Sequence, residues 1–203
     1  GSVFSGHSSA ANFRGFPLGK VRWQFRPKAL LLLRLEYGLS FAHPDNNGRL
    51  NIGVGPGGNV HGSALDMQLA PAPLVNRFSP MELATSGMLN ISLASFEIEN
   101  GQLQELSGTA DWQAAAIESP LVLPLGDIGL RLENNADTII ATVVEGGELG
   151  LSGDIMLAPA GRYDVDLLLR PAVSVDAATR NLLASMMQAN TSGDYILKST
   201  GSF

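Results

Sequence analysis

Apolar and polar residues alternate along much of this chain. Val21, Trp23 and Phe25 lie two residues apart, with polar residues between them. The longest alternating series is Leu31, Leu33, Leu35, Tyr37, Leu39 and Phe41. Successive side chains of a β-strand point to opposite faces of a sheet, so a period of two predicts strands with one apolar face. The series from Leu31 to Phe41 therefore predicts a single long strand.

The same period recurs towards the C-terminus, where turn residues interrupt it. Alternating segments occur at 50–54, 65–69, 89–98, 108–112, 128–132, 139–143, 149–157 and 163–169. The separators are rich in glycine and asparagine, which tight hairpin turns favour. They are a Gly/Pro segment at 53–58 and the dipeptides Asn100-Gly101, Asn134-Asn135, Gly146-Gly147 and Ala160-Gly161. The period slips between Leu93 and Phe96, and a β-bulge near Ala94 and Ser95 would absorb the slip.

Helical periodicity is scarce. It is clearest in 176–189, where Leu182, Leu183, Met186 and Met187 share one side. A shorter helical turn is expected around 74–78, between two prolines, and we expect both segments to cover sheet edges. The spacing of strands and turns predicts a mainly β fold, with roughly ten or more strands in one long, curved, mostly antiparallel sheet or open β-roll. No polar linker divides the chain, so residues 1–203 are expected to form a single domain.

The composition indicates a folded chain and argues against some classes of binding partner. Hydrophobic residues make up 45% of the 203 residues and charged residues 16%, whereas disordered chains are poor in the former and rich in the latter. The net charge of -6 opposes binding to nucleic acid or to anionic lipid. There is no cysteine, which excludes disulfides and thiolate metal sites. The apolar stretch 29–33 is far shorter than the roughly 20 residues that a membrane-spanning helix needs.

Two glycine-containing motifs resemble enzyme signatures but lack their structural context. Gly53–Gly58 matches the dinucleotide-binding pattern G-x-G-x-x-G, but a strand-like segment follows where that motif needs a helix. Gly6–Ala10 approaches the nucleophile elbow G-x-S-x-G without its second glycine and without a preceding strand. We therefore interpret the first as a hairpin turn and the second as a polar strand or loop.

The ionisable residues also favour structural roles. His7, His43 and His61 lack the spacing of a recognisable metal motif. The pairs Glu97/Glu99 and Asp164/Asp166 have strand spacing, which indicates a solvated sheet face more than the two opposed carboxylates of a glycosidase. The chain is thus expected to be neither an enzyme nor a cofactor-binding protein. Trp23 and Trp112 lie in alternating segments, where a large aromatic side chain normally packs on the core or a cross-strand neighbour.

Several short motifs follow one another along the chain. The chain opens with a glycine-small-apolar-aromatic-x-glycine turn at 1–6, followed by a tryptophan-centred strand at 18–27 that continues into Ala29-Leu30-Leu31. A glycine-x-x-x-tryptophan strand lies at 106–112. A closing order of strand, helix and strand occurs at Leu167–Pro171, Leu182-Leu183 and Gly193–Leu197. In this order the segments resemble protein N of the bacterial type II secretion system, and the resemblance extends over nearly all of the chain.

This resemblance implies a periplasmic β domain that an N-terminal membrane helix, absent from these residues, tethers to the inner membrane. It implies other secretion-system envelope proteins as partners, and no catalytic residue comes with it. We expect an interaction module that works in assembly of the machine. The alternative from another functional class is lipid or amphiphile binding in an apolar β-groove. The residues expected to form the interaction face or groove are Leu31, Leu33, Leu35, Tyr37, Leu39, Phe41, Trp23 and Trp112.

Overall fold

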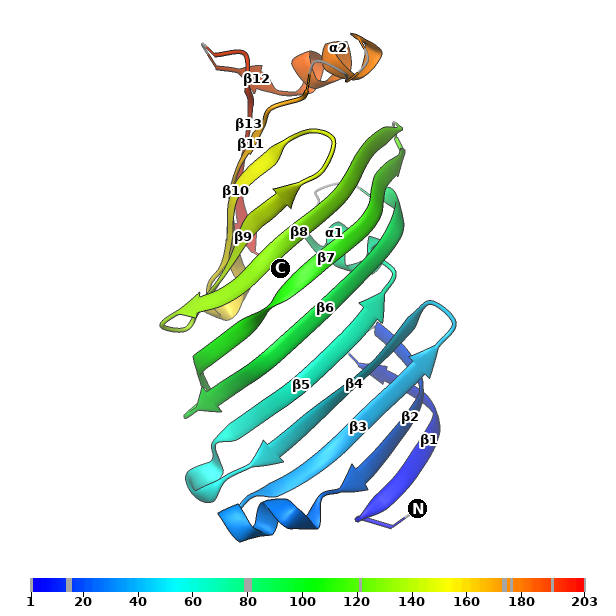
Figure 1. The fold of residues 1–203 in the computed structure, drawn as a ribbon, viewed down its shortest axis with the longest axis vertical. Coiled ribbons are helices and arrows are strands. Elements are labelled where there is room, and N and C mark those ends of the chain that lie inside the picture. Colours follow the sequence, from blue (N-terminus) through cyan, green and yellow to red (C-terminus); the bar gives the residue numbers. More distant parts are fainter. Residues whose placement is uncertain are drawn as a thin grey trace.

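The fold is dominated by one β-sheet. The computed structural model describes residues 2–13, 16–78, 82–120, 122–172, 175, 177–190 and 192–202. The strands formed by these residues join in a single 13-stranded sheet in which every pairing is antiparallel (Figure 1). The expectation of a mainly β, open antiparallel sheet with short helices is confirmed.

The strands lengthen towards the middle of the sheet. Their bounds are β1 Ser5–Phe13, β2 Phe16–Phe25, β3 Leu35–His43, β4 Asn46–Val54, β5 Val60–Leu69, β6 Ala84–Glu99, β7 Gln102–Ser119, β8 Leu123–Asn135, β9 Thr138–Gly146, β10 Leu151–Leu157, β11 Arg162–Leu169, β12 Gln188–Ala189 and β13 Tyr195–Ser202.

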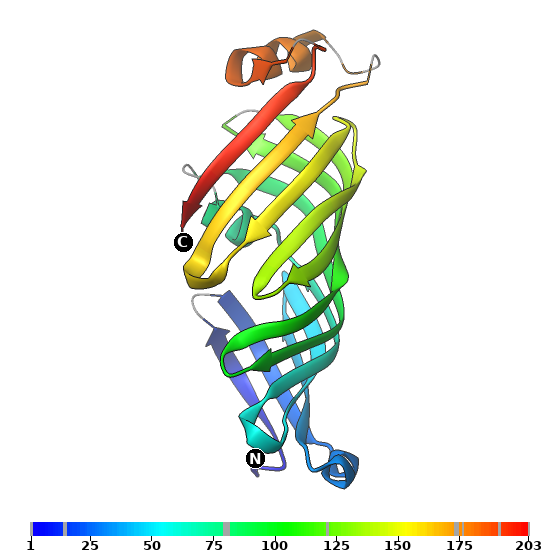
Figure 2. The ribbon, with the colours of Figure 1, turned by 90° about the vertical axis from the view of Figure 1, so that its left-hand side faces the viewer.

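The topology is a meander, because strands β1 to β10 each pair with the next strand in the chain. The order changes only at the end, where β13 lies between β11 and the two-residue strand β12. The sheet is twisted and curved along its length, with β1 near one end and β13 towards the other (Figures 1 and 2).

Several of the turns and the irregularity predicted from the sequence are where the pattern placed them. The turn predicted at Asn134-Asn135 is displaced, because both residues end strand β8 and residues 136–137 form the turn. Asn100 and Gly101 join β6 to β7 with φ of 52° and 78°. Positive φ at both positions suits a two-residue hairpin turn, and asparagine and glycine tolerate it best. The register between β6 and β7 shifts between Leu93 and Ser95, which confirms the bulge. Gly53–Gly58 closes the hairpin between β4 and β5 as a short 3₁₀ turn, η2 (Pro56–Gly58), and no helix follows it.

Four further short helical segments interrupt the strands. They are the 3₁₀ helices η1 (Pro27–Leu32) and η3 (Pro159–Gly161) and the α-helices α1 (Ala72–Phe78) and α2 (Ala177–Met186). Both α-helices were predicted, whereas η1 was not. The predicted end of the second helix at Ala189 is wrong, because α2 ends at Met186 and Gln188–Ala189 pairs with β13 as strand β12. The predicted helix start at Asp176 lies outside the described residues. Figures 1 and 2 show α1 on the concave side of the sheet and α2 at one end of it.

The strand predicted from Leu31 to Phe41 begins only at Leu35, so its first part is wrong. Pro27 cannot donate a backbone hydrogen bond, and it occupies the first turn of η1, a position that proline favours. The chain then reverses at Leu33, whose φ of 55° is left-handed, and Arg34 N–H donates to the Ala29 carbonyl at 3.1 Å. Alternation was a poor guide in this segment because apolar residues occupy both phases from Ala29 to Leu33.

The tightest core lies under α2. Leu183 from this helix is 1% exposed and packs with Leu123, Leu149 and Leu169 from the sheet and its loops. Met187 also packs against this cluster, while the side chains of Leu182 and Met186 lie outside the described residues. Burying a leucine fully contributes about 1.5–3 kcal/mol relative to leaving it exposed. The predicted apolar side of this helix therefore closes the C-terminal end of the sheet.

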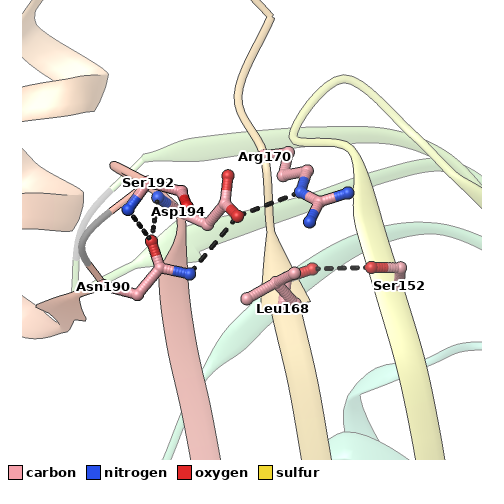
Figure 3. A network of polar contacts seen from close by, with 6 residues as sticks. All are labelled: Ser152, Leu168, Arg170, Asn190, Ser192 and Asp194. Atoms are coloured by element: carbon pink, nitrogen blue, oxygen red, sulfur yellow. Dashed lines mark hydrogen bonds and ion pairs between the residues drawn. The ribbon is translucent and has the colours of Figure 1, made fainter.

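A polar network holds the loop between β12 and β13 beside the end of β11 (Figure 3). The Asn190 side-chain oxygen accepts hydrogen bonds from the backbone N–H groups of Ser192 at 2.8 Å and Asp194 at 2.9 Å. The Asp194 carboxylate accepts from Arg170 Nε at 3.0 Å and from Asn190 Nδ2 at 3.3 Å. An asparagine that bonds its own backbone in this way fixes a turn, and the Arg170 contact ties that turn to β11.

Candidate interaction surfaces

The strand register sorts the side chains of the sheet onto two faces, because directly paired residues of neighbouring antiparallel strands project to the same side. Trp23 pairs with Leu39, and Leu39 pairs with Leu50. The neighbouring row is polar. In that row Arg22 pairs with Ser40 and Ser40 with Arg49. We call these sides the apolar face and the polar face.

The apolar face continues across the sheet without a break from β2 to β11. Its further paired members are Tyr37, Ile52, Leu65, Met67, Ile91, Leu93, Phe96, Trp112, Ile128, Leu130, Val143, Ile155 and Val165. A few are buried, such as Leu65 and Ile128, but most are only half-buried. A sheet whose apolar side is packed under a second layer would bury these side chains, so much of this face has no complete cover.

Six of the eight residues expected to form the interaction face lie on the apolar face. They are Trp23, Leu35, Tyr37, Leu39, Phe41 and Trp112. Each of the two indole rings contacts a residue on the strand next to its own. Trp112 Nε1 donates to the Ser86 carbonyl at 2.9 Å, and the Trp23 ring covers Gly6, its partner on β1, where a side chain would collide with it. The Phe25 ring lies 5.6 Å from Phe4 and 5.5 Å from Tyr37, which extends the aromatic contact beside Trp23.

Leu31 and Leu33 do not belong to that face. They lie in and directly after η1, where their side chains are 87% and 78% exposed. The sequence placed them in phase with Leu35 and Tyr37, but the reversal at Leu33 separates them from the strand. The predicted set therefore divides into a sheet face and an exposed loop.

The polar face carries a groove of about 1380 Å³ near the N-terminal end of the sheet. It is lined by β1 to β5 and by η1, and its walls are rich in positive charge. The cationic lining residues are Arg22, Arg26, Lys28, Arg34 and Arg49, whereas Glu36 is the acidic residue that lines it. The net charge of -6 thus conceals a local concentration of positive charge.

Two of these cations are paired and shape the groove walls. Arg26 Nη1 donates to Glu36 Oε1 at 3.2 Å, and the other Glu36 oxygen lies 3.8 Å from His61 Nε2. Arg49 donates twice to Asp66 Oδ2, at 3.0 and 2.8 Å. The hydrogen bonds from Arg49 and Ser92 lower the pKa of Asp66 from its ordinary value, because they favour the ionised carboxylate.

Sequence reasoning missed the cationic groove. One signal was present, since Arg22 and Arg26 fall on the same side of a predicted strand. The contribution of Arg49 depends on the pairing of β3 with β4, and that of Lys28 and Arg34 on the path of η1. Neither can be obtained from alternation along one segment.

Of the other chemical candidates, Glu97 is the register partner of His61 on the neighbouring strand. His43 Nδ1 accepts from the Asp45 backbone N–H at 3.4 Å, and His7 lines the groove. Gly6–Ala10 lies within strand β1, not at a strand-to-helix turn. Asp166 accepts from Lys198 Nζ at 2.8 Å, and this bond raises the pKa of Lys198. Within the described ranges, no group of three or more histidine, aspartate or glutamate side chains is arranged to hold a metal ion.

Two further observations concern the membrane and the solved structures. In the part of the chain that the structure describes, no helix has the length and apolarity needed to span a bilayer. No solved structure matches the chain. The side chains described above form two distinct surfaces, one apolar and one cationic.

Comparison with known proteins identifies the family. The model of the family described as type II secretion system (T2SS), protein N, matches residues 1–198. Type II secretion system protein N of Vibrio cholerae serotype O1 is 23% identical over 213 residues, which cover 99% of this chain and 82% of that protein. The protein of the same name from Klebsiella pneumoniae is 27% identical over 198 residues, covering 91% of this chain and 73% of that protein. Since the family model covers nearly the entire chain, this protein belongs to the type II secretion system protein N family and is a component of that secretion system.

Proposed function

We propose that the chain acts as one non-catalytic periplasmic domain, tethered to the inner membrane, that assembles with other envelope proteins of the secretion system. Family membership supports the type II secretion system as the assembly in which the chain acts. The observation that carries the assembly role is the incompletely covered apolar face, which ends at a free strand edge. Contact with a partner removes such apolar surface from water, and the area removed sets most of the driving force.

The described sheet ends in β1 on one side, and on the other side its free edge lies along β13. The proposal concerns the edge along β13. Strand β12 pairs only with Tyr195 and Ile196, so in the described part of the chain no strand pairs with the outer side of β13 from Leu197 to Ser202. Exposed edge backbone can bind an extended partner segment through main-chain hydrogen bonds, while side chains on alternate positions select it. Leu197 belongs to the apolar face through its pairing with Leu167, and it is exposed.

Site-specific photocrosslinking in intact cells tests this proposal. A photoreactive residue is placed at Thr200 on the free edge, and a matched control is placed at the exposed Arg131 on strand β8. We expect Thr200 to capture a component of the secretion system and Arg131 to capture much less. Capture of no secretion component from either position, in cells that actively secrete, contradicts the proposal. Protease accessibility in spheroplasts checks the periplasmic location independently.

The second candidate is binding of a lipid or amphiphile on the apolar face. The half-buried state of Trp23, Tyr37 and Leu39 favours it, because acyl chains would cover what the protein leaves open. Each methylene removed from water contributes about 0.8 kcal/mol. Native mass spectrometry of the purified chain after mixing with phospholipid tests this candidate.

Neighbouring residues on opposite faces supply the matched variants. Leu39→Glu places a charge on the apolar face, and Ser40→Glu places the same charge on the polar face. Lipid binding on the apolar face predicts that the first variant loses bound lipid and the second retains it. Absence of lipid from the unmodified chain contradicts this candidate and leaves the assembly proposal intact.

A further inference from the structure

Consecutive leucines project from the N-terminal end of the molecule. Leu30, Leu31, Leu32 and Leu33 are all exposed, and Leu35 continues the apolar surface. The segment is nevertheless ordered by its own contacts. Ala29 is buried beneath it, and the Leu33 N–H donates to the Leu30 carbonyl at 2.9 Å. We call residues Leu30–Leu33 the leucine tip. An ordered turn therefore holds these leucine side chains in solvent, where they can contact a binding partner at this end of the molecule.

A second apolar group lies at the same end. Val3 and Phe4 are exposed, and the Phe4 ring contacts Phe25 on β2 at a centroid distance of 5.6 Å. Figures 1 and 2 both place the N-terminus and η1 at the end of the molecule opposite α2. Large exposed apolar side chains thus gather at one pole, where scattered single residues would be ordinary.

Positive charge borders the leucine tip. Lys28 and Arg34 flank it in sequence, and both line the cationic groove together with Arg22. No ion pair in the described part of the chain involves these three side chains, whereas Glu36, the acid in the groove wall, is paired with Arg26. An apolar protrusion bordered by unpaired cations is complementary to a bilayer surface, where acyl chains lie beneath anionic headgroups.

We propose that this pole docks on a lipid bilayer that contains anionic phospholipid. The leucine tip enters the boundary between headgroups and acyl chains, and Lys28, Arg34 and Arg22 lie at the level of the phosphates. The long stems of lysine and arginine allow their charges to stay at that level while the neighbouring leucines are buried. This contact is additional to the membrane tether in the proposed function, and it orients the sheet relative to the membrane.

The overall charge of -6 does not oppose this contact strongly. Charges farther apart than about 10 Å are largely screened at 0.1 M salt, so the surface senses chiefly the nearest side chains. At this pole those nearest side chains are cationic. The protein should therefore approach an anionic bilayer in one orientation, with α2 pointing away.

The absence of cysteine permits a direct test. Leu31→Cys and Val122→Cys each introduce one thiol for an environment-sensitive fluorophore, the second in another exposed apolar position, between β7 and β8. The labelled proteins are mixed with vesicles of phosphatidylcholine, with and without about 30% phosphatidylglycerol. We expect a blue-shifted, brighter signal at position 31 with the anionic vesicles, and no change at position 122.

Vesicle flotation of the full chain then separates the contribution of the leucine side chains to binding from that of the cationic side chains. Leu31→Ser combined with Leu33→Ser should weaken binding at least about tenfold, because the removed side chains supply the apolar part. Lys28→Gln combined with Arg34→Gln should weaken binding to anionic vesicles by a similar factor and reduce its dependence on salt, with Arg22 left as the remaining cation. Val122→Ser serves as the control and should bind as the unmodified chain does.

Three outcomes overturn the inference: failure of the unmodified chain to bind anionic vesicles at low salt, equal signals at positions 31 and 122, or binding that the serine variant retains. Association of the protein with itself through the leucine tip, seen by sedimentation velocity and lost in the serine variant, also overturns it. The vesicles contain no secretion protein, so failure here leaves the proposed assembly role untouched.

Discussion

Short helical segments rich in leucine lie at both ends of this sheet, and the two ends use them differently. At the C-terminal end, α2 places Leu183 among Leu123, Leu149 and Leu169, where it is 1% exposed. At the N-terminal end, the leucine tip of η1 is exposed, and Ala29 is the residue that packs. The same residue type is core at one pole and surface at the other.

The difference lies in what the backbone allows each segment to cover. α2 is a regular helix that crosses the end of the sheet, and the polar network of Asn190, Asp194 and Arg170 fixes the chain that returns from it. η1 is a tight turn between two strands that are already paired with each other, so its side chains point away from the sheet. A leucine-rich segment therefore supplies apolar side chains, but the path of the chain around it determines whether those side chains are buried within the molecule or left exposed.

Leucine truncation at the two poles should produce the largest contrast. Leu183→Ala should lower the free energy of unfolding by about 2–5 kcal/mol, because it leaves a cavity in the packed cluster. Leu31→Ala should change it by no more than about 0.5 kcal/mol, because that side chain is already in water. Urea unfolding followed by tryptophan fluorescence measures both values. Equal losses for the two variants would show that the poles do not differ in packing.

A glycine at the reversal of the leucine tip should act in the opposite direction. Leu33 has φ of 55°, and the left-handed conformation costs a residue with a Cβ roughly 1–2 kcal/mol. Leu33→Gly removes that cost at the expense of greater freedom in the unfolded chain, so stability should rise by about 0.5–1 kcal/mol.

Leu32→Gly is the matched control for that substitution, because the neighbouring residue lies within η1 and has no positive φ. It should lower stability by about 0.5–1 kcal/mol. The same urea titration compares the two glycine variants. A loss of stability in both would indicate that the reversal at Leu33 is not the source of strain.

The smallest effects concern pH, and they differ between the two halves of the sheet. Arg49→Met removes the main hydrogen bond that lowers the pKa of Asp66, so the pKa should rise towards 3.8. A lowered pKa stabilises the fold at pH values above that of the unfolded carboxyl, and this contribution is lost as pH falls through the lower, folded value. The stability difference between the two proteins should thus be present at neutral pH and shrink below about pH 4. NMR titration of the Asp66 carboxyl carbon measures the shift directly.

The Lys198–Asp166 pair near the C-terminus provides the opposite pH dependence as a comparison. Its hydrogen bond raises the pKa of Lys198 above 10.5, so its contribution is present below that value and is lost as pH rises through the folded pKa. Asp166→Asn should remove the stability change that accompanies deprotonation of Lys198 on the alkaline side. An unchanged Lys198 titration in that variant would contradict the assigned cause.

The sequence alone was sufficient for the repeating parts of the fold. Alternation identified strands β2 to β11, Asn100-Gly101 identified a hairpin turn, and the phase slip at Ala94 identified the bulge. It also identified the apolar side of α2 through Leu183. These features depend on residues close together in the chain, where side-chain direction follows directly from backbone period.

Only the tertiary structure decided the rest. It separated Leu31 and Leu33 from the face that holds Tyr37, because consecutive apolar residues in both phases leave a turn and a strand equally consistent with the pattern. It also brought Arg49 to the groove that Arg22 lines, through pairing of strands across a hairpin. Local pattern fixes which residues share a side of one strand, whereas strand pairing and the path of the connections determine which sides meet, which stay open, and where charge accumulates.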